Sequence, residues 1–378
     1  MKQEIPLFDV LIIGGGLAGL TNAIHLTKFG KRVLIIEKNA YPQHKVCGEY
    51  ISNEVLPYLF FLGINPFNSK AVAIDRFQLS TTKNKVISAD LPLGGFGISR
   101  YTFDHLLANK AKAQGTLFKH DVVKSVNFTN NQFEVITKEN QKYTAKVVIG
   151  AYGKRSMLDV KLERNFIKKK SPYLAVKMHV KGTFPEDLVG LHNFKGGYCG
   201  VSKVDNNTIN LCYITNYTSF KKYGDIHSFQ EHVIFKNHFL KKLFNETIPV
   251  FDKPLTISQI SFQTKKPIEN HVLMCGDAAG MIHPLCGNGM GMAIQSAQIA
   301  SKLILEYING TISSRKELEK RYIRQWNKTF KYRLKVGHFI AMLFRKDRIA
   351  EIMLMILKRI PFLVPIIIKQ THGKPMKV

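Results

Sequence analysis

The start of the chain carries a short glycine-rich segment between two apolar runs, which restricts the fold more than any other feature. Residues 8–13 are mostly apolar, and Gly14-Gly15-Gly16-Leu17-Ala18-Gly19 follows them. A helical pattern then leads to a second apolar run, residues 33–36, which ends at Glu37. Strand, glycine turn, helix, strand and terminal acid follow in this order in a βαβ unit that binds a dinucleotide.

Each position in this motif has a physical role. Gly14 permits a tight turn, Gly16 lets backbone N–H groups approach a pyrophosphate, and Gly19 lets helix and strand pack closely. The N-terminus of the helix offers positive potential to the phosphates. Glu37 can accept hydrogen bonds from both ribose hydroxyls and disfavours a 2′-phosphate, which favours FAD or NAD over NADP. The alternative is a glycine-rich turn in an ordinary βαβ unit.

Length, composition and cysteine usage limit the class of protein. The 378 residues are enough for two domains, and 45% hydrophobic residues predict a globular chain. The five cysteines are odd in number and lack CxxC spacing, which predicts reduced thiols without disulfides or a metal site. We see no signal peptide and no apolar stretch long enough to span a bilayer, so we expect a cytoplasmic protein.

The net charge of +28 has two interpretations. Most of the excess is lysine spread along the chain, which is compatible with ordinary solvated faces. The functional interpretation is attraction to an anionic surface, and arginines are concentrated in the last quarter of the chain, from Arg315 to Arg359. No nucleic-acid-binding module is recognisable, so we expect no nucleic-acid partner. Peripheral membrane contact and the oligomeric state stay open.

A second glycine-rich segment lies far along the sequence. An apolar run, residues 272–275, leads into Gly276-Asp277, and three further glycines follow at Gly287, Gly289 and Gly291. At the end of a strand, Asp277 is placed to bind the hydroxylated chain that joins an isoalloxazine to its phosphates. The glycines let the backbone approach a flat ring, and the next helix points its positive end at the reduced ring. Both segments together predict one bound flavin nucleotide.

The second motif resembles that of the FAD-dependent hydroxylase superfamily, and Cys47-Gly48-Glu49 makes the chain look more like its geranylgeranyl reductase branch. The resemblance implies an α/β fold: a three-layer FAD-binding domain of the glutathione-reductase-like type, an inserted mixed β-sheet substrate domain and a helical C-terminal segment. It also implies that Arg100 lies near the FAD phosphates. The predicted cofactor-binding residues are Gly14, Gly16, Leu17, Ala18, Gly19, Glu37, Lys38, Cys47, Gly48, Arg100, Val123, Ala151, Gly153, Gly276, Asp277, Pro284, Gly287, Gly289 and Gly291.

The sequence departs from the family pattern in three places. Tyr152 stands where the middle motif usually has an aspartate, which argues against direct, hydroxylase-style use of NADPH. Residues 197–203 lack the tryptophan, phenylalanine and proline of the reductase strand, which argues against a geranylgeranyl chain as the substrate. The only tryptophan, Trp326, lies in the basic C-terminal segment, which argues against the Trp-x-Trp pair of flavin halogenases.

The pattern of elements predicts a discontinuous division of the chain. We assign residues 1–72, 96–156 and 266–310 to the FAD-binding domain, and residues 73–95 and 157–265 to the substrate domain. Within the latter, residues 229–244 predict one amphipathic helix. Residues 311–378 form the basic and apolar C-terminal segment, where residues 349–368 are apolar but interrupted by charges and prolines. They predict either an interfacial segment or, the favoured interpretation, a helix pair that covers the substrate cavity.

The predicted function is FAD-dependent oxidoreduction of a lipophilic small molecule. In the favoured hypothesis a carbon–carbon double bond is reduced, NAD(P)H is a candidate electron donor, and a site acid supplies a proton. Cys47 is the candidate acid, against the alternative of a small buried apolar residue. A flavin monooxygenase that hydroxylates or epoxidises an aromatic or polyene is the second hypothesis. The third is a membrane- or RNA-binding flavoprotein with structural FAD.

Overall fold

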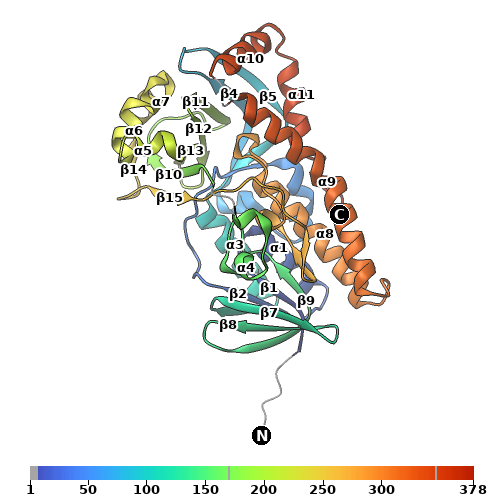
Figure 1. Cartoon of the computed structure of the whole chain (residues 1–378). Helices are drawn as coiled ribbons and strands as arrows, with labels where there is room; N and C mark the ends of the chain where they lie inside the picture. Colours follow the sequence, from blue (N-terminus) through green and yellow to red (C-terminus); the bar gives the residue numbers. More distant parts are fainter. Residues whose placement is uncertain (1–6, 169–170, 345–346) are drawn as a thin grey trace.

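The computed structural model describes residues 7–168, 171–344 and 347–378, and the first six residues of the predicted FAD-binding domain lie outside it. In this part of the chain the strands form two sheets, of eight and nine strands. Figure 1 shows the first sheet at the end of the molecule near the N-terminus and the second sheet at the opposite end.

The first sheet is built around two mostly apolar parallel strands, β1 (Leu7–Ile13) and β2 (Val33–Glu37). Both faces of these strands are covered, which is why β1 and β2 read as continuous apolar runs. In spatial order the strands are β16 (Ile268–Glu269), β17 (Val272–Met274), β9 (Lys142–Gly150), β1 (Leu7–Ile13), β2 (Val33–Glu37) and β6 (Leu117–His120). The hairpin of β7 (Val123–Thr129) and β8 (Gln132–Thr137) joins β9 antiparallel.

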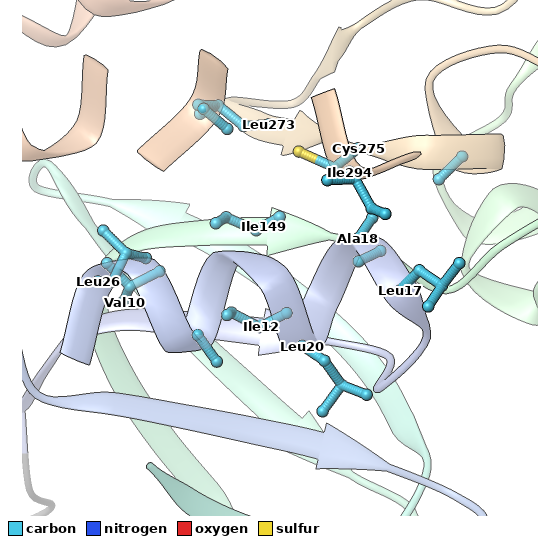
Figure 2. Close-up of a cluster of buried hydrophobic side chains, with 14 of the residues drawn as sticks. Val10, Ile12, Leu17, Ala18, Leu20, Leu26, Ile149, Leu273, Cys275 and Ile294 are labelled. Atoms are coloured by element: carbon cyan, nitrogen blue, oxygen red, sulfur yellow. The ribbon is translucent and has the colours of Figure 1, made fainter. Parts of the chain in front are cut away.

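Helix α1 (Leu17–Lys28) packs against α3 (Arg100–Ala113) and α8 (Gly289–Ile308). Figure 2 shows Ala18 of α1 below Cys275 and Ile294, which come from the late part of the chain. All three side chains belong to one buried apolar cluster. This cluster therefore brings the two glycine-rich segments, far apart in sequence, to the same end of the first sheet.

The second sheet is mostly antiparallel, with one parallel pairing between β4 and β11. Its strands, in spatial order, are β14 (Ile248–Pro249), β10 (Tyr173–Lys181), β13 (Thr208–Asn216), β12 (Gly197–Val204), β11 (Leu188–Phe194), β4 (Val72–Ser80), β5 (Val86–Gly97) and β3 (Tyr50–Ser52), and β15 (Leu255–Ser258) pairs with β10. The shorter helices of the chain are α2 (Leu56–Phe61), α4 (Met157–Lys161), α5 (Tyr217–Lys221), α6 (Ile226–His232) and α7 (His238–Asn245).

The prediction of one helix over residues 229–244 is wrong. The structure has two helices, because α6 ends at His232 and Asn237 caps α7 by accepting hydrogen bonds from the N–H groups of Phe239 and Leu240. The amide of Asn237 is buried and donates to the Asn193 carbonyl of β11, 3.0 Å away. A buried cap fixed to the sheet interrupts the apolar periodicity that the sequence suggests.

The C-terminal segment folds into α9 (Arg315–Phe344), α10 (Asp347–Arg359) and α11 (Leu363–Thr371). Both α10 and α11 contact β5, and Leu354 and Leu357 belong to a buried cluster with Leu79 and Ile87 of the second sheet. The last residues return to the first domain, where Gly373 donates to the buried carboxylate of Glu54. These helices thus cover the second sheet. Of the described helices, none combines the length and apolarity that a bilayer span requires.

Candidate active site

One cavity of about 570 Å³ lies between the two sheets and the C-terminal helices. Gly16, Leu17 and Ala18 line it from the first glycine-rich segment, and Gly276 and Asp277 line it from the second. A Cβ atom on Gly276 would lie 3.1 Å from the Cβ of Ala18. The two segments therefore meet directly at one end of a shared cavity, as the prediction of a single nucleotide requires.

The first glycine turn is shaped by backbone contacts on one side and left open on the other. Gly14 has a φ of +100°, and a Cβ there would lie 2.6 Å from the Ala151 carbonyl oxygen. A Cβ on Gly19 would overlap the Gly14 carbonyl. A Cβ on Gly16, in contrast, meets nothing nearer than the Arg100 guanidinium at 3.8 Å. Gly14 and Gly19 therefore hold the turn together, whereas Gly16 faces the space that a phosphate would fill.

Glu37 lies beside this turn at the end of β2. Its carboxylate accepts hydrogen bonds from the N–H of Gly15 (2.6 Å) and of Asn39 (3.0 Å). Tyr41 donates its hydroxyl to the Gly15 carbonyl on the same side. The acid is thus held next to the glycine backbone, where it can meet the ribose of a dinucleotide whose pyrophosphate lies on α1.

Arg100 brings a fixed positive charge to the cavity from the first turn of α3. Its guanidinium donates two hydrogen bonds to the buried carboxylate of Asp104, at 2.7 and 2.8 Å. Lys45 contacts the same carboxylate at 2.8 Å. Burial opposes ionisation of Asp104, but Arg100 and Lys45 outweigh it and lower its pKa. The three residues carry a net positive charge, which suits an anionic ligand.

A buried cluster of charged residues that the sequence analysis missed lies under the Cys47-Gly48 loop. The backbone of Glu49 has a φ of +56°. Its carboxylate accepts hydrogen bonds from the Lys177 ammonium, from His179 Nε2 (2.6 Å) and from the backbone N–H of Arg100 (2.7 Å). Burial works against the charge on Glu49, yet Lys177 and His179 bring its pKa below the usual value. The sequence signal was two polar residues on one face of the apolar strand β10, and nothing in it identified Glu49 as their partner.

His44 extends this cluster toward the surface. Its ring lies 5.2 Å from that of His179 and stacks on Tyr101, whose ring is 4.6 Å away. Burial and the nearby Lys177 ammonium lower the pKa of His44 to about 4. The imidazole is therefore neutral at pH 7.

A second buried network, also missed from the sequence, supports the Gly276-Asp277 segment. Arg164 pairs with Asp159 (2.8 Å) and donates to the Ala278 carbonyl (2.9 Å), while Lys265 donates to the Asp277 carbonyl (2.7 Å). Tyr152, the residue that replaces the family aspartate, donates its hydroxyl to Asp159. Burial lowers the pKa of Lys265 to about 8. Tyr152 is thus part of the support of the second glycine segment.

The other end of the cavity is apolar. Strands of the second sheet contribute Leu79, Leu191 and Val201, and the C-terminal helices contribute Ile340 and Leu357. Few polar groups reach this space, so it suits an extended apolar substrate. Cys47 is half-buried and lines the same cavity as Arg100.

Most of the predicted cofactor residues line the cavity: Gly16, Leu17, Ala18, Cys47, Gly48, Arg100, Ala151, Gly153, Gly276, Asp277, Pro284, Gly287 and Gly289. Gly14, Gly19 and Glu37 lie behind the lining as described above. Gly291 lies within α8, where a Cβ would overlap the Asn288 side chain. Lys38 is exposed after β2, and Val123 is buried in the core at the start of β7.

A family model described as an FAD binding domain matches residues 8–324, which is most of the chain. The chain belongs to the FAD binding domain family. Digeranylgeranylglycerophospholipid reductase of Methanosarcina acetivorans is 26% identical over 371 residues, covering 89% of this chain and 83% of the relative. The reductase of the same name from Thermoplasma volcanium is also 26% identical, covering 84% and 86%. Conditioned medium factor receptor 1 of Dictyostelium discoideum is 23% identical, covering 90% and 70%.

Solved structures with the same fold include flavin-dependent halogenases. The brominase Bmp2 has a TM-score of 0.80 at 18% identity and covers 97% of this chain and 93% of its own. The halogenase PltM in complex with phloroglucinol and FAD has a TM-score of 0.73 at 16% identity and covers 90% and 78%. These similarities confirm the predicted α/β flavoprotein fold. The family match, together with the glycine turns and fixed cations of the cavity, identifies the chain as an FAD-dependent oxidoreductase.

Proposed function

We propose that the protein reduces carbon–carbon double bonds in the isoprenoid chains of a lipid. The observation that carries the proposal is the lining of the cavity, which is formed outside the glycine segments by apolar side chains of the second sheet and of α9–α11. An isoprenoid chain matches the apolar chemistry of this lining better than a small polar substrate does. The names of the relatives from Methanosarcina and Thermoplasma point to the same class of substrate.

The protein's own residues would hold the cofactor and exclude water. Glu37 would bind the ribose, Gly16 and the start of α1 the pyrophosphate, and Asp277 the ribityl chain. Bound FAD supplies the redox chemistry. The apolar lining keeps solvent from the reacting carbons, and Arg100 stays cationic beside the phosphates because Asp104 holds its charge in place.

Reduction of a carbon–carbon double bond adds a hydride to one carbon. The other carbon must then receive a proton. We propose that Cys47 Sγ holds this proton, since the residue lines the cavity together with the glycine segments and the apolar side chains of the second sheet. Glu49, Lys177 and His179 position the loop that carries the thiol, because Glu49 is two residues from Cys47 and tied to β10. Cys212 also lines the cavity, and burial raises its pKa to about 12, which keeps it a thiol.

The test uses FAD-loaded protein reduced with light and a sacrificial donor under argon. We expect a lipid with unsaturated isoprenoid chains to reoxidise the flavin absorbance and to gain two hydrogens per double bond in the mass spectrum. Cys47→Ser and Cys47→Ala are expected to bind the lipid and FAD but to reoxidise at least about ten-fold more slowly. An unchanged rate in Cys47→Ala, with full reduction of the lipid, contradicts the role of the thiol.

The same experiment decides between the reductase and a monooxygenase. A monooxygenase shows no anaerobic turnover and instead consumes oxygen and incorporates it into the lipophilic substrate. NAD(P)H is proposed only as a candidate donor, since Tyr152 argues against hydroxylase-style use of NADPH, and its test is bleaching of the bound FAD by NADH or NADPH under argon. Failure of both nicotinamides indicates a donor of another class, such as a reduced protein carrier.

A further inference from the structure

The outward side of the C-terminal helices is unusually apolar for a surface that faces solvent. On α9 and α10 the large exposed side chains lie three or four residues apart, and Phe362 lies four residues before Ile366 of α11. We call these residues the apolar face: Phe339 and Met342 of α9, Ile352, Met355 and Ile356 of α10, Phe362, and Ile366 of α11, each between 47% and 66% exposed.

The exposed residues of α10 and α11 face away from the second sheet. The opposite sides of the helices are buried, with Leu354 and Leu357 of α10 and Val364 of α11 packed on the second sheet. Figure 1 shows α10 and α11 together beside β4 and β5 at one end of the molecule. A helix that buries one apolar stripe and exposes another is apolar over most of its circumference, which a soluble surface helix does not need.

The segment of sequence that carries the apolar face is strongly basic. Residues 331–378 contain 11 lysines and arginines but only two carboxylates, Asp347 and Glu351. Glu351 is paired with Lys83 at 2.6 Å. Exposed bases flank the apolar face at Lys335, Lys358 and Lys369.

We propose that the apolar face docks on an anionic lipid bilayer, with its side chains in the headgroup and acyl boundary and its bases on the lipid phosphates. Charge complementarity favours this occupant, because a second copy of the chain would bring the same positive charge against the face. Phe339 belongs to the apolar face and also lines the cavity, so the cavity reaches the surface where the bilayer would lie. This inference concerns a binding surface and does not depend on the reaction that the cavity supports.

The first test measures co-sedimentation of the full-length, FAD-loaded protein with sucrose-filled vesicles, without any substrate or reductant. Vesicles of phosphatidylcholine with 30% phosphatidylglycerol are compared with pure phosphatidylcholine, at low and at high salt. We expect binding to the anionic vesicles that weakens as salt rises. Absence of binding to anionic vesicles at low salt overturns the proposal.

Paired variants separate the apolar face from the overall charge. Lys358→Ser with Arg359→Ser is expected to lower the partition coefficient about five-fold per base, whereas Lys241→Ser with Lys242→Ser on α7 should change it little. Ile352→Ser with Ile356→Ser is expected to lower it at least about ten-fold. Its control is Ile248→Ser with Val250→Ser, two exposed aliphatic residues near β14. If the variants of the apolar face and their controls lose vesicle binding equally, the proposal that this face docks on the bilayer is overturned. Vesicle binding is then caused by the net charge of the protein.

A reporter measurement serves if the serine variants are unstable. The chain has one tryptophan, Trp326, which is buried, so an added indole can be followed against it. Ile356→Trp is expected to lose fluorescence on vesicles with brominated acyl chains, while Ile248→Trp should not. An oligomer that disappears in Ile352→Ser with Ile356→Ser, without quenching of Ile356→Trp, identifies the face as a contact between copies and overturns the proposal.

Discussion

The two ends of the cavity are lined by different kinds of chemical group. The nucleotide end is made of backbone turns, glycines and fixed charges such as Arg100, and its geometry is set within short stretches of sequence. The apolar end is made of side chains such as Leu191 and Leu357, which come from the second sheet and from the C-terminal helices. A small added side chain is therefore expected to abolish FAD binding at the nucleotide end, but only to weaken lipid binding at the apolar end.

The largest effect is expected from one added side chain at the nucleotide end. Gly16→Val fills the open space at the turn without touching the fold, because a Cβ there has no near contact. We expect FAD affinity to fall at least about 100-fold, or roughly 3 kcal/mol. Asp277→Ala is expected to yield protein without the yellow cofactor as well. The measurement is the FAD content after purification and titration of the apo-protein.

Gly200→Val adds the same bulk at the apolar end and is the matched control. Gly200 lines the cavity on β12, and a Cβ there meets only ordinary contacts at 3.7 Å or more. We expect full FAD content with weaker lipid binding. If Gly16→Val keeps its FAD while Gly200→Val loses it, the assignment of the two ends is reversed.

Among the effects on stability, the largest is expected at the buried ion pair of Glu49 and Lys177. Lys177→Met leaves the buried Glu49 carboxylate without its main counter-charge, so we expect a loss of about 3–5 kcal/mol in the free energy of unfolding. Combining Lys177→Met with Glu49→Gln removes both charges and should cost less than the sum of the single variants. Urea unfolding of the apo-proteins measures this, and strict additivity contradicts the ion pair.

A smaller effect is expected in the helices that cover the apolar end. Leu354 is 1% exposed, and Leu354→Ala should weaken the packing of α10 on the second sheet by about 2–3 kcal/mol. The FAD affinity should stay unchanged because the nucleotide end does not depend on α10. Hydrogen exchange in α10, compared with the outward-facing variant Ile352→Ala, measures the effect. Equal exchange rates in the two variants indicate that α10 does not pack as described.

The smallest effect is a dependence of stability on pH. The folded pKa of His44 is about 4, below the usual 6.5, so the unfolded chain binds a proton more readily. The contribution of His44 to the free energy of unfolding is therefore complete above about pH 6.5 and is lost as the pH falls toward 4. His44→Phe should flatten this part of the stability curve of the apo-protein. An identical curve in the variant shows that other groups cause the acid loss.

The sequence predicted the features that depend only on residues close together along the chain. The glycine turn, Glu37 and the Gly276-Asp277 segment were recognisable because each needs a particular residue at a fixed distance along the chain. The replacement of the family aspartate by Tyr152 was also visible, but its meaning was not. Only the structure shows its hydroxyl on Asp159, within the network that supports the second glycine segment.

Other features depend on contacts between distant residues. Glu49 lies far from Lys177 and His179 in the sequence, and no periodicity joins them. The buried cap at Asn237 broke a helix that the apolar pattern predicted as continuous, because its amide bonds to a neighbouring strand. Such contacts are decided by how the sheets and helices pack, and a linear pattern does not encode the partner.

By itself, the sequence determined the class of cofactor and the α/β fold, because phosphate-binding turns and buried parallel strands depend on residues that lie close together along the chain. The tertiary structure alone decided what the cavity offers beyond the nucleotide. It placed the C-terminal helices over the second sheet, with one apolar side buried and the other exposed. The reason is that burial is a property of the assembled surface, and an apolar residue in the sequence does not say which neighbour will cover it.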